Sequence, residues 1–189
     1  MRLGSVALLG SWVALVACSK SSSNGASAAS SGSGGGLDSK VTFPLTSSDF
    51  SADTPLPKVS SCDGGDRSPA LAWSGNLGET KSFALIADDP DAPSGDFTHW
   101  VLFDIPKSAS LLTQGVNDVG VQGKNDFDKL GYGGACPPPG KLHHYYFRLY
   151  ALDIEKLGLG PGASRADVEG AMKGHVLAKG ELMGTYERK

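Results

Sequence analysis

Two aspartates and a histidine are the residues whose types and spacing most suggest a binding site. Asp89 and Asp91 stand one residue apart in the segment Asp89-Pro-Asp-Ala-Pro93, and His99 follows shortly after it. Each proline fixes the backbone φ angle and removes an amide donor, so the segment is stiff. A stiff loop of this kind can hold two carboxylates at one point near an imidazole. Aspartate and proline also form ordinary turns, and the alternative is that both carboxylates bond to their own backbone.

Two apolar segments on either side of this loop have the lengths and bounds of β-strands. The first covers residues 82–88 and the second covers residues 99–105. Short apolar runs bounded by turn residues favour strands over helices. The loop that carries the two aspartates therefore joins two buried strands. Loops held by rigid scaffolds are common positions for binding groups.

A second group of candidate residues opens a third strand, predicted over residues 142–152. Alternation places His143 and Tyr145 on one face of this strand and His144 on the opposite face. The preceding segment, residues 131–140, is rich in glycine and proline. Its glycines permit close approach to a ligand, and its prolines make it rigid.

The remaining elements are predicted from shorter signals. We expect edge strands over residues 41–45 and 50–57, a short strand that ends at Trp73, and a last strand over residues 176–186. Residues 111–128 are expected to form a long surface loop. Ser164 is a predicted N-cap for a helix over residues 166–173, which Gly174 ends. Strands dominate, so the predicted fold class is mostly β.

The N-terminus has the pattern of an export signal. The apolar run over residues 6–17 is too short to span a bilayer and is typical of a signal-peptide core. It ends in Leu15-Val-Ala-Cys18, which resembles the lipobox of bacterial lipoproteins, whose cysteine is lipidated. The alternative is an ordinary secretory signal in which Cys18 has no role. We predict a signal peptide over residues 1–17, a flexible Ser/Gly-rich tether over residues 18–36 and one domain over residues 37–189.

Charge and cysteine content narrow the class of protein further. The formal net charge is −3, so the basic footprint of a nucleic-acid-binding protein is absent. The chain has three cysteines. If Cys18 is lipidated, Cys62 and Cys136 form an even pair in an oxidising compartment. A disulfide between these two and a pair of free thiols remain alternatives.

Together these segments resemble the phosphatidylethanolamine-binding protein family, and more closely its bacterial, Raf-kinase-inhibitor-like (YbhB/YbcL-type) branch. The resemblance covers nearly all of the predicted domain. Among the motifs that carry it, in order, are Ser68-Pro-Ala-Leu-Ala-Trp73, Asp89-Pro-Asp-Ala-Pro93, His99-Trp100, Gly131-Tyr-Gly-Gly134, Cys136-Pro-Pro138 and Gly174-His-Val-Leu-Ala178. The resemblance implies an antiparallel β-sandwich with Greek-key links and a small C-terminal helical part.

The resemblance also implies a small anion-binding pocket at one end of the central sheet. The ligand-binding residues that it implies are Asp89, Asp91, His99, His143 and Tyr145, with Gly134 and Pro137 at the rim. Two nearby carboxylates are expected to raise the pKa of the histidines. Imidazolium, tyrosine hydroxyl and glycine amide groups are suitable donors for a phosphate or a carboxylate. The chain departs from the family at His144, where arginine is usual, and that arginine's pairing is not expected to carry over to a shorter, largely neutral imidazole.

The sequence leaves three classes of function open. The favoured one is a non-enzymatic module that binds a small phosphorylated or anionic ligand, such as a phospholipid head group, without cofactor or metal. It would be held by the Cys18 lipid at the bacterial cell envelope, on its periplasmic or outer surface. The alternative is a regulator or inhibitor of a protein partner, such as a protease or kinase. An enzyme is less favoured, because no catalytic residue is identified and G-x-S-x-G, H-E-x-x-H and C-x-x-C motifs are all absent.

Overall fold

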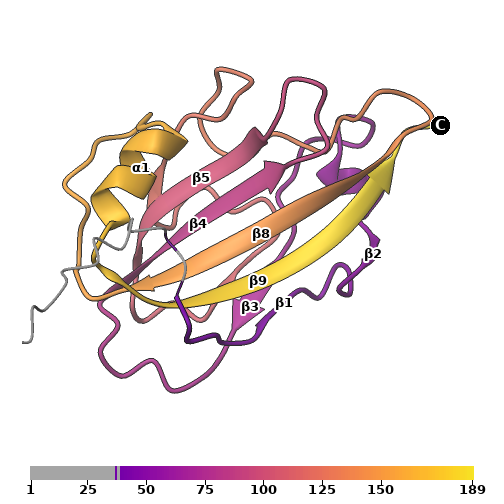
Figure 1. The fold of residues 1–189 in the computed structure, drawn as a ribbon. Coiled ribbons are helices and arrows are strands. Elements are labelled where there is room, and N and C mark those ends of the chain that lie inside the picture. Colours follow the sequence, from indigo (N-terminus) through magenta and orange to yellow (C-terminus); the bar gives the residue numbers. More distant parts are fainter. Residues whose placement is uncertain (1–36, 38) are drawn as a thin grey trace, which may run out of the picture. The chain divides into compact units, whose positions relative to one another are not determined.

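Six strands form the central sheet of the computed structural model, which describes Leu37 and residues 39–189 (Figure 1). The order of the strands is β2–β9–β8–β4–β5–β7. The long strands are β4 (Ser82–Asp89), β5 (Phe97–Pro106), β8 (Leu142–Leu152) and β9 (Val176–Glu187), each antiparallel to its neighbours among them. The short edge strands are β2 (Thr54–Pro55), parallel to β9, and β7 (Val121–Gln122), antiparallel to β5.

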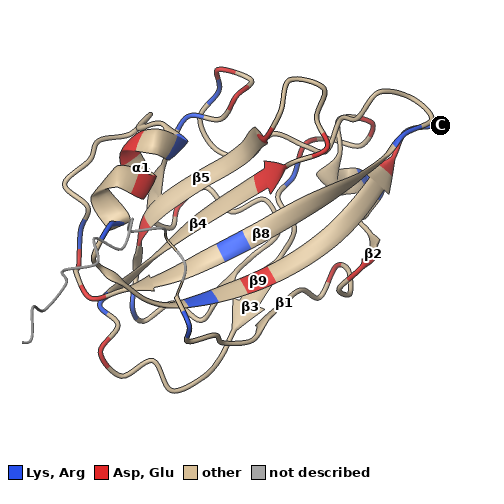
Figure 2. Ribbon diagram, in the orientation of Figure 1, with Lys and Arg blue, Asp and Glu red and all other residues tan. Residues whose placement is uncertain are grey.

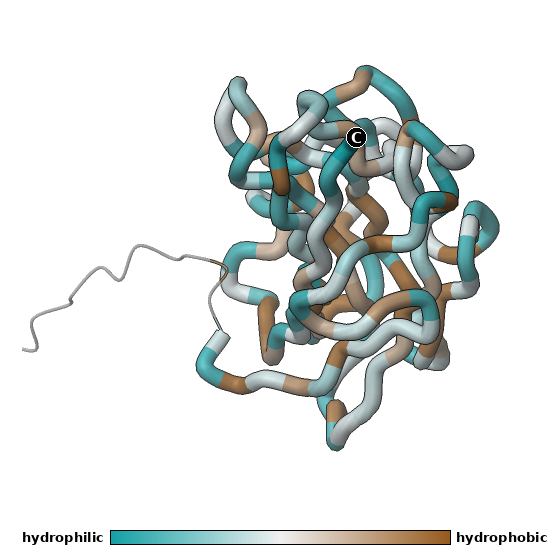
Figure 3. Tube along the Cα trace, turned by 90° about the vertical axis from the view of Figure 1, so that its right-hand side faces the viewer, coloured by the Kyte–Doolittle hydropathy of each residue, from teal (hydrophilic) through white to brown (hydrophobic). Residues whose placement is uncertain are grey.

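A second, three-stranded sheet covers one face of the central sheet. Its antiparallel strands are β1 (Leu45–Thr46), β3 (Leu71–Trp73) and β6 (Leu111–Leu112), in the order β1–β3–β6. Side chains from the two sheets form the larger hydrophobic core, in which Phe83 and Leu85 of β4 pack with Leu71 and Trp73 of β3. Hydrophobic segments run through the interior, and hydrophilic ones lie mainly in the outer loops (Figure 3).

The helix α1 (Arg165–Met172) packs against the other face of the central sheet. Its Val168 and Met172 belong to the same hydrophobic cluster as Ala84 and Ile86 of β4, which alternate with the β4 residues of the larger core. Both faces of β4 are thus buried, and all eight of its residues are buried. This explains why β4 is apolar along most of its length instead of alternating with polar residues.

The capping signal predicted for the helix is confirmed. Ser164 accepts a hydrogen bond from the Asp167 amide, and the Asp167 side chain accepts one from the Ser164 amide, which completes a capping box. The two bonds satisfy amide groups that the first turn leaves without partners. The strand predicted over residues 142–152 is present with these bounds, as β8. The two strands around the aspartate loop and the last strand are also present, with ends that differ by one or two residues.

Several shorter elements differ from the sequence prediction. Residues 111–128 are not one loop, because they contain β6 and β7. The strand expected over residues 41–45 is reduced to Leu45–Thr46, and the one over 50–57 to Thr54–Pro55. The prolines in these segments have no amide donor, so they contribute fewer ladder bonds. Residues 41–43 and Leu56 still exchange single backbone hydrogen bonds with β9. A short 3₁₀ helix, η1 (Lys58–Ser60), was not predicted.

The predicted signal peptide, tether and Cys18 lipidation fall on residues 1–36 and lie outside the described residues. No helix in the described part of the chain is long and apolar enough to span a membrane.

Acidic and basic residues are interspersed over the described chain (Figure 2). A cluster of three charged side chains lies on the helix side of the central sheet. Arg148 of β8 bonds to Asp88 of β4 and to Glu181 of β9. Burial and the neighbouring Asp96 raise the pKa of Asp88 to about 6, although Arg148 acts to lower it. The group joins three adjacent strands on the face opposite the larger core.

Candidate ligand-binding pocket

A cavity of about 370 Å³ lies at the end of the central sheet where β4 ends and β5 and β8 begin. This is the end at which the C-terminus lies in Figure 1. Asp89, His99 and His143 are almost fully buried and form its floor. Phe127 and Arg188 are more exposed and lie at its mouth. The other lining residues are Ala92, Pro93, Ser94, Phe97, Cys136, Pro137 and Pro138.

The register of the sheet explains why these segments meet. Asp89 at the end of β4 pairs with Phe97 at the start of β5, and Asp88 pairs with Tyr146 near the start of β8. A register shift between Ala87 and Asp88 marks a bulge in the β4–β5 ladder. The partners change from Trp100 to Thr98 there, so the extra residue of the bulge is His99 of β5. Regular alternation along β4 places Asp88 on the helix side with Ala84 and Ile86, where it bonds to Arg148, and places Asp89 on the opposite face, where it lines the cavity.

Asp89 and His143 form a buried carboxylate–imidazole pair. The distance between His143 Nδ1 and Asp89 Oδ2 is 2.7 Å, and each side chain is only 4% exposed. The other oxygen, Oδ1, accepts a hydrogen bond from the Asp91 amide at 2.9 Å. Because a carboxylate oxygen accepts, Nδ1 of His143 carries a proton and donates it. Nε2 of His143 is then the ring atom that remains for a ligand: it donates to an anion when the ring carries both protons, and it accepts a hydrogen bond when the ring is neutral.

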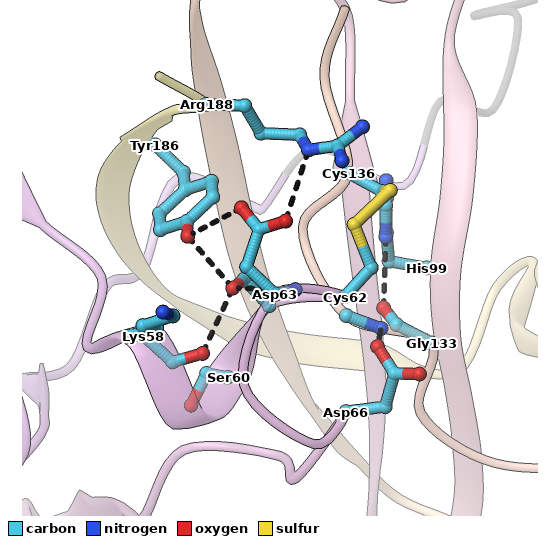
Figure 4. The surroundings of a disulfide bond; sticks show 12 residues. Lys58, Ser60, Cys62, Asp63, Asp66, His99, Gly133, Cys136, Tyr186 and Arg188 are labelled. Atoms are coloured by element: carbon cyan, nitrogen blue, oxygen red, sulfur yellow. Dashed lines mark hydrogen bonds and ion pairs between the residues drawn. A yellow bond between two sulfur atoms is a disulfide. The ribbon is translucent and has the colours of Figure 1, made fainter. Parts of the chain in front are cut away.

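His99 is held differently from His143. Its Nδ1 lies 2.8 Å from the Gly133 carbonyl oxygen, to which it donates a proton, and the second nitrogen points away from Gly133 (Figure 4). The rings of Phe97, Phe127 and Tyr145 surround it at centroid distances of 5.1–5.4 Å. Burial lowers the pKa of His99, and this outweighs the opposite effect of Asp89. The expectation that the carboxylates raise both histidine pKa values is therefore wrong for His99, whose Nε2 is an acceptor when the ring is neutral.

Tyr145 lies beside the floor of the cavity but does not line it. Its ring packs edge-on against His99, and burial, together with the Asp89 carboxylate, raises its pKa. The hydroxyl therefore stays protonated at neutral pH. It has no hydrogen-bond partner among the described residues, which is uncommon for a buried hydroxyl.

The structure does not bring Asp91 into the cavity. Oδ2 of Asp91 accepts hydrogen bonds from His144 Nδ1 at 2.7 Å and from the His144 amide at 2.9 Å. The bond from His144 lowers the pKa of Asp91. The turn explains the separation, because Asp89 accepts the amide of Asp91 while the Asp91 side chain bonds to the outer face of β8. His144, which departs from the family pattern, thus has a defined partner.

The two predicted rim residues have different roles. Pro137 lines the cavity together with Cys136 and Pro138. Gly134 does not line it; its amide donates to Asp66 Oδ1 at 3.1 Å. A Cβ at position 134 would lie 2.3 Å from that oxygen and 2.7 Å from the carbonyl carbon of Ser61. Gly134 therefore lets the segment before β8 approach residue 61 closely.

A disulfide joins this segment to the loop after η1. Cys62 and Cys136 have an S–S distance of 2.02 Å and a Cα–Cα distance of 5.4 Å (Figure 4). Backbone hydrogen bonds from Cys62 to Ala135 and from Ala135 to Ser60 flank the bond. Since Cys136 lines the cavity, the disulfide fixes part of the cavity wall.

Arg188 is the site residue that sequence reasoning missed. It is the penultimate residue of the chain, and the β8–β9 pairing of His143 with Tyr186 brings it to the cavity. Its Nε donates to Asp63 Oδ1 at 3.1 Å (Figure 4). The sequence held a usable signal, because antiparallel pairing of the two predicted strands over their full length places residues 186–188 beside His143.

The chemistry of the cavity follows from these contacts. It combines a guanidinium at the mouth, an imidazole–carboxylate pair at the floor and a wall of phenylalanine and proline side chains. In residues 37 and 39–189, no three His, Cys, Asp or Glu side chains are grouped to hold a metal ion. The arrangement can offer charge-assisted hydrogen bonds to a small polar group and apolar contact to whatever is attached to it.

Comparisons with known proteins agree with this architecture. A family model described as phosphatidylethanolamine-binding protein matches residues 46–187. A UPF0098 protein of Aquifex aeolicus is 51% identical over 139 residues, which cover 70% of this chain and 81% of the relative. The UPF0098 protein YbcL of Escherichia coli is 42% identical over 141 residues, which cover 68% of this chain and 75% of the relative.

Two solved structures share the fold. A phosphatidylethanolamine-binding protein homolog from Chlamydia trachomatis, CT736, has a TM-score of 0.74 and 40% identity, over 78% of this chain and 99% of that chain. The crystal structure of Escherichia coli YbcL has a TM-score of 0.73 and 36% identity, over 79% of this chain and 100% of that chain. These matches confirm the predicted fold class and the predicted branch. The chain belongs to the phosphatidylethanolamine-binding protein family, in its YbcL-type branch.

Proposed function

We propose that this protein is a non-enzymatic binding protein for a small ligand that carries a phosphate or another anionic group. The observation that carries the proposal is the convergence of the His143–Asp89 pair and the Arg188 guanidinium on one cavity. Imidazolium, with Nδ1–H on Asp89 and Nε2–H free to donate, and guanidinium both donate to anions, and such charged donors form the stronger hydrogen bonds. Membership of a family named for phosphatidylethanolamine binding supports the same class of ligand.

The size of the cavity limits the ligand. Its volume of about 370 Å³ is near the lower end of small-molecule sites. A head group or another small phosphate ester fits such a volume, whereas a whole diacyl lipid does not. The aromatic wall formed by Phe97 and Phe127 would contact the apolar part of an esterified ligand.

Replacing His143 by glutamine tests the proposal. The amide of glutamine can still donate to Asp89, so the buried carboxylate keeps a partner, but the imidazole Nε2 is lost. We expect the affinity for O-phosphoethanolamine, measured by calorimetry with the purified protein, to fall about ten- to a hundredfold, because a hydrogen bond to a charged group is removed.

His175 provides a matched control for this variant. Its Nδ1 bonds to Asp153 Oδ1 at 2.8 Å, close to the end of β8 that lies away from the cavity, and both side chains are well exposed. His175→Gln should leave the affinity unchanged. Equal losses in both variants would contradict the assignment of the pocket. A wild-type protein that binds neither phosphate esters nor carboxylates would contradict the proposed function itself.

The proposal includes attachment to the bacterial envelope through a lipid on Cys18, supported by the sequence Leu15-Val-Ala-Cys18. We expect Cys18→Ser to release the protein from the membrane fraction, because one apolar anchor is lost. The thermal unfolding of the domain should be unchanged. Retention of the variant in membranes after a high-salt wash would show that attachment does not depend on this cysteine.

A further inference from the structure

Arg188 is fixed at the mouth of the cavity by both its backbone and its side chain. Its carbonyl oxygen accepts a hydrogen bond from the Gly140 amide at 2.8 Å, which ties the end of the chain to the segment before β8. Its Nε donates to Asp63 Oδ1 at 3.1 Å, and the side chain is 33% exposed. The guanidinium, which lines the cavity, is thus held in one place by its bond to Asp63 (Figure 4).

Asp63, which holds Arg188, is itself held by a second hydrogen bond. Its other carboxylate oxygen, Oδ2, accepts from the Tyr186 hydroxyl at 3.0 Å. The Tyr186 oxygen in turn lies 2.8 Å from Ser61 Oγ. Both carboxylate oxygens of Asp63 therefore have partners, and one of them is the guanidinium.

The disulfide connects this arrangement to the cavity wall. Cys62 directly precedes Asp63, and its partner Cys136 lines the cavity. The loop that positions the guanidinium is covalently joined to the wall that the ligand would touch. A shift of the Asp63 carboxylate relative to the cavity is therefore restrained by a covalent bond as well as by hydrogen bonds.

The charges of the lining residues single out Arg188. It is the one lysine or arginine among the described residues that line the cavity. His99 is neutral at pH 7 because burial lowers its pKa, and Asp89 adds a negative charge at the floor. Nε of Arg188 donates to Asp63, and the two terminal nitrogens of the guanidinium have no hydrogen bond or ion pair in the described part of the chain. Those two nitrogens form a donor pair that can bond to two oxygens of one phosphate or carboxylate group.

We propose that Arg188 is the residue that selects an anionic ligand, and that Asp63 is its positioning residue, held by Tyr186 and the Cys62–Cys136 disulfide. This inference rests on the proposed function, since it concerns the same cavity. It assigns the main positive charge of the site to Arg188 instead of to the histidines. It also makes the affinity depend on a side chain, Asp63, that does not line the cavity.

The test is a double-mutant cycle with Arg188→Gln, Asp63→Asn and the double variant. Calorimetry would use inorganic phosphate and O-phosphoethanolamine as probes. We expect Arg188→Gln to weaken binding about ten- to a hundredfold, since a charged donor pair is lost. Asp63→Asn should weaken it by up to about tenfold, because only the bond that orients the guanidinium changes. In the Arg188→Gln background, Asp63→Asn should have no further effect, which is the signature of action through Arg188.

Two further variants separate positioning from general destabilisation. Arg188→Lys keeps the charge without the planar donor pair and should retain part of the affinity. Lys179→Gln removes a cation from β9 outside the cavity lining and should leave binding unchanged. Equal losses from Asp63→Asn in both backgrounds, or wild-type affinity in Arg188→Gln, would overturn the inference while the proposed function stands. No binding of any anion by the wild type would overturn the proposed function instead.

Discussion

Removal of the Cys62–Cys136 disulfide is expected to lower the free energy of unfolding by about 4 kcal/mol. The bond joins residues that are 74 positions apart in the sequence, so it closes a long loop in the unfolded chain. In the loop-entropy model, stabilisation grows with the logarithm of loop length. The double variant Cys62→Ser/Cys136→Ser avoids a lone reactive thiol. Urea denaturation followed by circular dichroism measures the change.

The disulfide prediction has its own control. Reduction of the wild type by a dithiol should give the same loss of stability as the double variant, and it should have no effect on the variant. A loss well under 1 kcal/mol would contradict the prediction. Two alkylatable thiols at Cys62 and Cys136 in freshly isolated protein would show that the bond is not formed.

The main strands were predictable because their sequence patterns are local. β8 alternates buried and more exposed residues from His143 to Leu149, which gives a period of two. β4 is a continuous buried run bounded by turn residues. The two-residue strands β6 and β7 have no such signal. They are strands only because Leu112 lies opposite Leu71 and Val121 lies opposite Phe103, and these pairings depend on distant parts of the chain.

The candidate site also combines residues that local motifs predict with features that depend on distant parts of the chain. Asp89, His99, Pro137 and His143 follow from motifs, and the structure places all four around one cavity. Asp91 shares the motif but lies outside the cavity, because the direction of its side chain depends on the turn and on His144. The two carboxylates of the site implied by the resemblance predicted a raised pKa for His99. The surrounding aromatic rings, which come from three separate segments, reverse the direction by burial.

Breaking the Asp89–His143 pair is the second change for which we expect a large effect. Asp89→Ala should lower the free energy of unfolding by about 3–5 kcal/mol, because removing one partner leaves the other buried without it. The Asp91 amide would lose its acceptor as well. The variant should also lose affinity for phosphate esters. Chemical denaturation and calorimetry measure the two effects separately.

Replacing both Asp89 and His143 by apolar residues tests whether the buried pair serves stability or ligand binding. Well-packed apolar side chains often replace a buried ion pair with no loss of stability. Asp89→Leu/His143→Phe should therefore recover most of the stability that Asp89→Ala loses, while ligand binding stays abolished. Such an outcome means that stability alone does not require the pair, and that its role is to hold an imidazole nitrogen toward the cavity. A double variant that remains as unstable as Asp89→Ala would assign the pair a structural role, and one that binds phosphate esters normally would remove it from the site.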